Sequence, residues 1–160
     1  MLLNITKSLI IACVLLAVAS PALGTDDLSL IEAVRNRDSR AAAVLVAEKV
    51  DVNATQPDGA TALHWAAQWD DVSMAELLIR AGARADVAND YGATPLSMAT
   101  LNGSEPMVER LLEAGAPPNT TLPSGETALM TAARSGSVEV VKVLVAAGAN
   151  VNATEFALGQ

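Results

Sequence analysis

Residues 59–91 read GATALHWAAQWDDVSMAELLIRAGARADVANDY, and the same pattern returns twice along the 160-residue chain. The copy at residues 92–124 reads GATPLSMATLNGSEPMVERLLEAGAPPNTTLPS, and the copy at residues 125–157 reads GETALMTAARSGSVEVVKVLVAAGANVNATEFA. The three copies align at a spacing of 33 residues without a gap. A fixed repeat of this length predicts stacked copies of one supersecondary unit, so the repeat decides the fold.

Each copy predicts two short helices separated by a turn. The first helix begins after a threonine, whose hydroxyl can accept a hydrogen bond from a backbone N–H of the first turn: Thr61, Thr94 and Thr127. The turn between the helices holds residue types that tolerate a positive φ: Asp70, Gly103 and Gly136. A glycine ends the second helix in every copy: Gly82, Gly115 and Gly148. The chain is 51% hydrophobic but only 2% aromatic, which favours close packing of alanine- and leucine-rich helices.

The pattern resembles the ankyrin repeat, whose opening G-x-T-P-L-H-x-A-A-x-x-G is approached by GATALHWAAQWD and GATPLSMATLNG. The later L-L-x-x-G-A-D-V-N stretch of the family is similar to LLIRAGARADV and LVAAGANVNA. The resemblance covers residues 27 to 160. It implies an all-α solenoid of helix-turn-helix units joined by β-turn or hairpin-like loops. It also implies a non-catalytic module that binds a protein partner through the concave face of the stack.

The repeat divides the chain into segments. Residues 25–58 are expected to form a degenerate, capping first repeat, because Leu30, Ala33 and Asn53 keep the register while the TPLH box is absent. Full repeats follow at the following ranges: 59–91, 92–124 and 125–157. Residues 158–160 look like the start of a truncated further repeat. The alternative function is therefore a targeting or scaffold arm of a larger exported protein, with further repeats or an enzyme domain beyond residue 160. Pro117 and Pro118 predict an irregular link before the third copy.

The N-terminus predicts export. Residues 1–24 contain Lys7, then an apolar run of about a dozen residues, then Ala22 and Gly24 at the positions of small residues before a cleavage site. We expect a cleaved signal peptide and a periplasmic or extracellular bacterial protein without membrane contact after cleavage. A retained N-terminal membrane anchor is the alternative, as is lipidation at Cys13, the chain's one cysteine. The N-x-S/T sequons that share one repeat position are interpreted as a feature of the repeat turn: Asn53, Asn119 and Asn152.

The sequence offers little for chemistry. His64 is the one histidine, and its equivalents in the other copies are Ser97 and Met130. The resemblance implies that this histidine is structural, tying its turn to neighbouring backbone; catalysis at His64 is the minor alternative. Without a second histidine or a cysteine in the mature chain, we expect no metal site, and the nucleophile and phosphate-binding motifs are absent as well. The net charge of −8 argues against nucleic acid. We expect a monomer with no cofactor.

Comparison of the copies leaves a set of residues free to contact a partner. Trp65 shares its position with Met98 and Thr131 and is expected to pack between adjacent repeats. Trp69 has polar equivalents, so it is either a binding anchor on the concave face or a half-buried ring that shields the next repeat. The resemblance places the other candidates on the first helices and loop tips. The full set of candidate partner contacts is Trp69, Gln68, Asp58, Tyr91, Leu101, Asn102, Glu126, Arg134 and Ser135.

Overall fold

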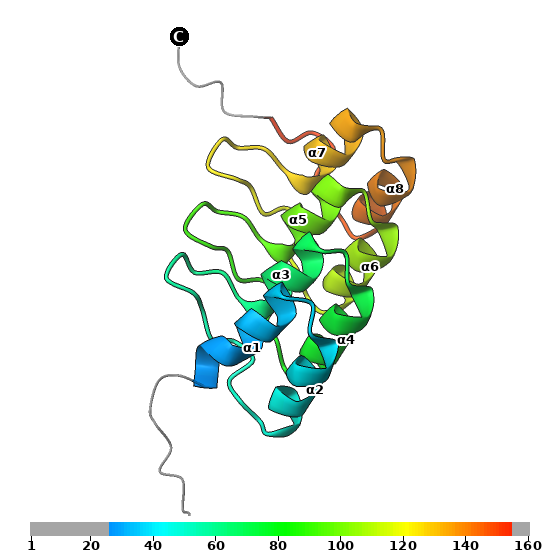
Figure 1. Cartoon of the computed structure of the whole chain (residues 1–160). Coiled ribbons are helices and arrows are strands. Elements are labelled where there is room, and N and C mark those ends of the chain that lie inside the picture. Colours follow the sequence, from blue (N-terminus) through cyan, green and yellow to red (C-terminus); the bar gives the residue numbers. More distant parts are fainter. Residues whose placement is uncertain (1–25, 155–160) are drawn as a thin grey trace, which may run out of the picture.

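The computed structural model describes residues 26–154 (Figure 1). The expected signal peptide and the expected start of a further repeat at 158–160 lie outside these residues. Within the described range the chain forms eight helices and no strand. The helices are α1 Asp26–Arg35, α2 Ser39–Ala47, α3 Ala62–Gln68, α4 Val72–Arg80, α5 Pro95–Asn102, α6 Glu105–Glu113, α7 Ala128–Ser135 and α8 Val138–Ala146.

The helices pair and the pairs stack, which confirms the predicted all-α solenoid. Each odd-numbered helix packs against the helix that follows it and against the next odd-numbered helix along the stack. The even-numbered helices form the second layer (Figure 1). Three long loops project from the stack in Figure 1: loop 1 (residues 48–61), loop 2 (81–94) and loop 3 (114–127). We call the surface made by these loops and the odd-numbered helices the concave face.

Small residues let the layers approach closely. The alanines at one repeat position of α3, α5 and α7 are completely buried: Ala66, Ala99 and Ala132. The leucines of the second helices are equally buried and fill the space between the layers: Leu78, Leu111 and Leu144. Leu30 and Ala33 of α1 are buried at matching positions, so the degenerate first copy contributes to the same core. The core is therefore one continuous layer along the stack and not a set of separate clusters.

The turns form as the sequence predicts, and the threonine hydroxyl caps the first helix in two of the three copies. The exception is Thr61, whose Oγ1 makes no cap hydrogen bond and lies 2.9 Å from His64 Nδ1. Thr94 accepts a hydrogen bond from Ser97 N and Thr127 accepts one from Met130 N, each at 3.2 Å. The inter-helix turn has a positive φ in every full copy, at 54° for Asp70, 69° for Gly103 and 72° for Gly136. The backbone conformation is therefore constant although the residue type changes.

Pro117 and Pro118 do not weaken the hairpin-like turn of loop 3, and that part of the prediction is wrong. Loop 3 keeps its hairpin, with an antiparallel bridge between Thr121 and Thr127 and a backbone hydrogen bond of 2.9 Å from Leu122 N to Glu126 O. The two prolines precede this hairpin in the chain, so their missing N–H groups are not required by it.

An asparagine side chain bridges consecutive loops at two points of the stack. Asn53 of loop 1 donates from Nδ2 to Gly82 O (3.0 Å) and accepts at Oδ1 from Arg84 N (2.8 Å) at the start of loop 2. We call this pair of hydrogen bonds the asparagine bridge. It ties the side chain of one repeat to two backbone groups of the next through one planar amide, so it fixes the spacing of the two repeats.

The asparagine bridge recurs once and is missing once. Asn119 of loop 3 donates to Gly148 O (3.1 Å) and accepts from Asn150 N (2.7 Å). In loop 2 the same repeat position is Asp86, whose carboxylate cannot donate a hydrogen bond. The backbone nitrogen that would donate to it belongs to Pro117, which has no N–H. Both hydrogen bonds of the bridge are therefore unavailable between loops 2 and 3.

None of the helices among residues 26–154 is both long and apolar enough to cross a lipid bilayer.

Candidate functional site

A cavity of about 380 Å³ opens on the concave face between α3, α5 and loops 1 and 2. Its lining residues are Asp58, Ala60, His64, Trp65, Gln68, Trp69, Asn89 and Met98. Asp58, Gln68 and Trp69 were predicted as partner contacts, so the structure brings three of the candidates together in one place. Asn89 and Met98 were not predicted. The repeat register could have found Met98, because it is the equivalent of Trp65 in the next copy.

The two tryptophans form a stacked pair at this cavity. Trp65 lies in α3 and Trp69 is the C-cap residue of the same helix, one turn later. Their ring centroids are 6.2 Å apart with an interplanar angle of 29°. Trp65 is half-buried and its Nε1–H donates to Gln56 Oε1 of loop 1 at 3.0 Å. The guanidinium carbon of Arg35 in α1 lies 6.0 Å from the centre of the Trp65 ring. Trp65 is thus fixed between repeats, as predicted.

Trp69 is supported from one side and open on the other. Its side chain stacks on Trp65 of the same helix, yet the residue remains 41% exposed. The exposed part of the indole is available to a partner, and partner contact at Trp69 stays a prediction. A ring that is held by a neighbour and still faces solvent presents apolar area that loses little side-chain entropy on binding.

His64 forms one wall of the cavity and has a structural role, as predicted. A backbone N–H can only donate, so Nδ1 accepts from Thr61 N (3.1 Å); a carbonyl can only accept, so Nε2–H donates to Ala93 O (3.2 Å). Thr61 Oγ1 also lies 2.9 Å from Nδ1. Burial lowers the pKa of His64 below its usual 6.5, although the Ala93 carbonyl and the Asp58 charge act in the opposite direction. The ring is neutral and both nitrogens are engaged.

The described residues contain no group of three or more His, Cys, Asp or Glu that could hold a metal ion. Since both nitrogens of His64 are used by the fold, the imidazole is not free to act as a base either.

The remaining candidates lie elsewhere on the concave face. Tyr91 at the tip of loop 2 and Leu101 on α5 are 72% and 68% exposed. Asn102, at the end of α5, donates from Nδ2 to the carbonyls of Ala67 (3.0 Å) and Gln68 (3.1 Å), so its amide joins α5 to α3. Partner contact at these three positions stays a prediction.

Two of the three candidates from the third full copy bind each other. The Arg134 guanidinium pairs with the Glu126 carboxylate, which also accepts a hydrogen bond of 2.7 Å from Thr131 Oγ1. The Thr131 hydroxyl and then Arg134 hold the pKa of Glu126 below its usual range. Ser135 Oγ donates to Ala132 O at 3.1 Å. None of the three candidates lines the cavity at Trp69.

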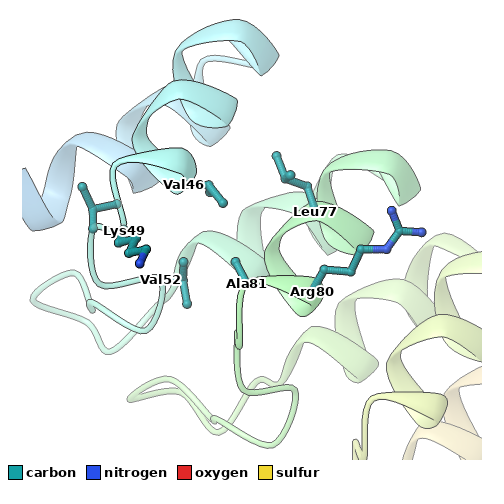
Figure 2. Close-up of a pocket in the computed structure, with 7 residues that line it drawn as sticks. Val46, Lys49, Val52, Leu77, Arg80 and Ala81 are labelled. Carbon is teal, nitrogen blue, oxygen red and sulfur yellow. The ribbon is translucent and has the colours of Figure 1, made fainter.

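A second cavity, of about 530 Å³, lies on the opposite layer between the ends of α2 and α4 (Figure 2). It is lined by Val46, Lys49, Val50, Val52, Leu77, Arg80 and Ala81, which the sequence did not single out. The Arg80 guanidinium points away from it in Figure 2 and pairs with Glu76 Oε1 at 2.5 Å. Lys49 has a φ of 62° where the other copies have glycine. This cavity offers apolar contact and one amine.

Comparison with known proteins identifies the repeat. The family model for ankyrin repeats in three copies matches residues 30–122, and the model for a single ankyrin repeat matches residues 124–155. No curated protein matches the chain.

Proposed function

Because this chain belongs to the ankyrin repeat family, we propose that it binds a protein partner through the concave face, with Trp69 as the main contact. Ankyrin repeats generally mediate protein–protein interaction, and proteins built from them are typically non-catalytic. The observation that carries the proposal is the exposed face of the Trp69 indole, stacked on the fixed ring of Trp65 at the mouth of a cavity. Tryptophan is enriched among residues that dominate binding energy.

Two further exposed side chains support the same surface. Tyr91 and Leu101 are apolar or aromatic and belong to loop 2 and α5, the elements beside the cavity. With Trp69 they give the second and third repeats an apolar contact area on the concave face. The polar residues at the same level, such as Gln68, fit the rim of a protein interface, where water is not excluded.

The compartment is part of the proposal. We propose that the protein is exported, because residues 1–24 have the composition and order of a signal peptide. Mass spectrometry of the protein isolated from its native cells tests this: the mature chain is expected to begin at Thr25. A chain that retains residues 1–24 in the cytoplasm would contradict export without affecting the proposed binding surface.

Affinity capture from the native compartment tests the binding function. Three baits are compared: the wild-type protein, the Trp69→Ala variant and the Val138→Ala variant. Val138→Ala is the matched control, because Val138 on α8 is 60% exposed and lies in the other layer. We expect partners held by wild type and Val138→Ala to be lost with Trp69→Ala. An unchanged partner list with Trp69→Ala would overturn the proposal. Circular dichroism of each bait establishes that it is folded.

A further inference from the structure

The cavity at Trp69 contains one ionised group among its lining residues. Asp58 is the acid, while the other polar lining groups are the amides of Gln68 and Asn89 and the neutral imidazole of His64. The remaining lining is apolar or aromatic. A cavity that combines indole faces with one carboxylate has the chemistry of a site for an organic cation, because the π face and the carboxylate both attract positive charge.

The chain already shows how a guanidinium binds at one end of the tryptophan pair. Arg35 lies with its guanidinium carbon 6.0 Å from the centre of the Trp65 ring, and its Nη2 also contacts Glu32 Oε1 at 3.3 Å. One guanidinium is thus shared between an indole and a carboxylate. The planar group suits this arrangement because it can stack on a ring and donate in its own plane at the same time.

The cavity itself is lined by the second indole of the pair and by a carboxylate without a cation. Trp69 is the exposed ring, and no basic side chain of residues 26–154 forms a salt bridge with Asp58. Asp58 is held in place, since its Oδ1 accepts from Ala60 N (3.1 Å) and its backbone carbonyl accepts from Asp90 N (2.9 Å). Its second carboxylate oxygen accepts no hydrogen bond within the described range. A fixed acceptor that lines the same cavity as an exposed indole is preorganised for a donor.

We propose that this cavity receives the guanidinium of an arginine side chain from the protein partner, stacked on Trp69 and paired with Asp58. The inference rests on the proposed function and specifies the chemistry of the partner. The net charge of −8 complements a partner that is basic at its contact site. Arginine fits better than lysine because a compact ammonium cannot stack on the indole and donate in its plane.

Peptide binding tests the proposal directly. The probes are acetylated, amidated pentapeptides Gly-Leu-X-Leu-Gly in which X is arginine, lysine or citrulline, the neutral analogue of arginine. Binding is measured by calorimetry and by the fluorescence of Trp65 and Trp69, the chain's two tryptophans. We expect the arginine peptide to bind about tenfold more tightly than the citrulline peptide and to change the fluorescence. Equal binding of arginine and citrulline overturns the proposal, and equal binding of lysine overturns the preference for a planar guanidinium.

A matched pair of acid variants tests the role of Asp58. Asp58→Asn is expected to weaken the arginine peptide about fivefold and to leave the citrulline peptide unchanged. Glu109→Gln is the control, because Glu109 is an exposed acid of α6, in the other layer, that does not line the cavity. Equal weakening by both variants would show general attraction to an acidic surface and would contradict the site. Loss of partner capture by Trp69→Ala without any effect of Asp58→Asn would leave the proposed function standing while this inference fails.

Discussion

Two neighbouring junctions of the stack have the same fold but are held together differently. The α3/α5 junction is the place where loop 1, α3 and α4 meet loop 2, α5 and α6. Four groups donate or accept hydrogen bonds across it: the side chains of Asn53, His64 and Asn102 and the backbone of Asp90. The α5/α7 junction is the place where loop 2, α5 and α6 meet loop 3, α7 and α8. Among the described residues no hydrogen bond between residues distant in sequence crosses this junction, which depends on apolar packing. Copies of one repeat are therefore joined by different interactions.

The difference coincides with the candidate site. The cavity and the tryptophan pair lie at the α3/α5 junction, where the first helices are joined at both ends: His64 at their N-terminal side and Asn102 at their C-terminal side. A binding surface built across two repeats needs those repeats to keep a constant spacing, because reordering them would cost affinity. The hydrogen-bonded junction provides that constant spacing.

The largest expected effect comes from removing His64. His64→Ala leaves the buried Thr61 N–H and the part-buried Ala93 C=O without their partner, so we expect the free energy of unfolding to fall by about 3 kcal/mol. Ser97→Ala at the equivalent position of α5 is the control, because Ser97 bonds only within its own turn, and we expect a loss of about 1 kcal/mol. Urea denaturation measures both. Similar losses for the two variants would show that His64 does not join the repeats.

The asparagine bridges should have a smaller effect. Asn53→Ala and Asn119→Ala each remove two hydrogen bonds to backbone groups, and each is expected to cost about 1.5 kcal/mol in the free energy of unfolding. Asp86→Ala at the same repeat position should leave stability unchanged within the error of denaturation experiments. Asp86 bonds only to Arg84 in its own exposed loop. A cost for Asp86→Ala equal to that of Asn53→Ala would contradict the distinction between the junctions.

The smallest expected effect is the dependence of stability on pH. Burial lowers the folded-state pKa of His64 below the 6.5 of the unfolded chain, so the unfolded chain binds more protons between the two values. The stabilisation is complete above pH 6.5 and is lost as the pH falls through that interval. The Ala93 carbonyl and the Asp58 charge offset part of the loss. Thermal unfolding followed down from pH 7 should show the decrease in wild type and not in His64→Asn; identical profiles would refute this assignment.

The fold could be predicted because every copy repeats the same local signals. The threonine caps, the turn residues at positive φ and the buried alanines and leucines all recur at a spacing of 33 residues, so each copy supports the others. Pro117 and Pro118 misled the prediction, since sequence alone does not show that the loop 3 hairpin starts after them.

The site was less accessible from sequence because its contacts are long-range. The asparagines of the bridges read as sequons of a repeat turn, and nothing local shows that the Asn53 amide bonds to residues about 30 positions later. Trp69 stood out by its polar equivalents, but only the structure gives its exposed fraction of 41% and its support by Trp65. The hydrogen bonds from the Asn102 amide to the backbone of α3 could not be predicted either, because they form only when the repeats stack.

A partner protein is expected to bind over the α3/α5 junction. Gln68 on α3 and Arg134 on α7 occupy the same repeat position, and both are exposed. A photo-reactive benzoylphenylalanine placed at either position, in otherwise wild-type protein in its native compartment, reports which junction the partner covers. We predict that residue 68 cross-links to a partner protein and that residue 134 does not. Cross-linking from residue 134 at an equal or higher yield would contradict the account.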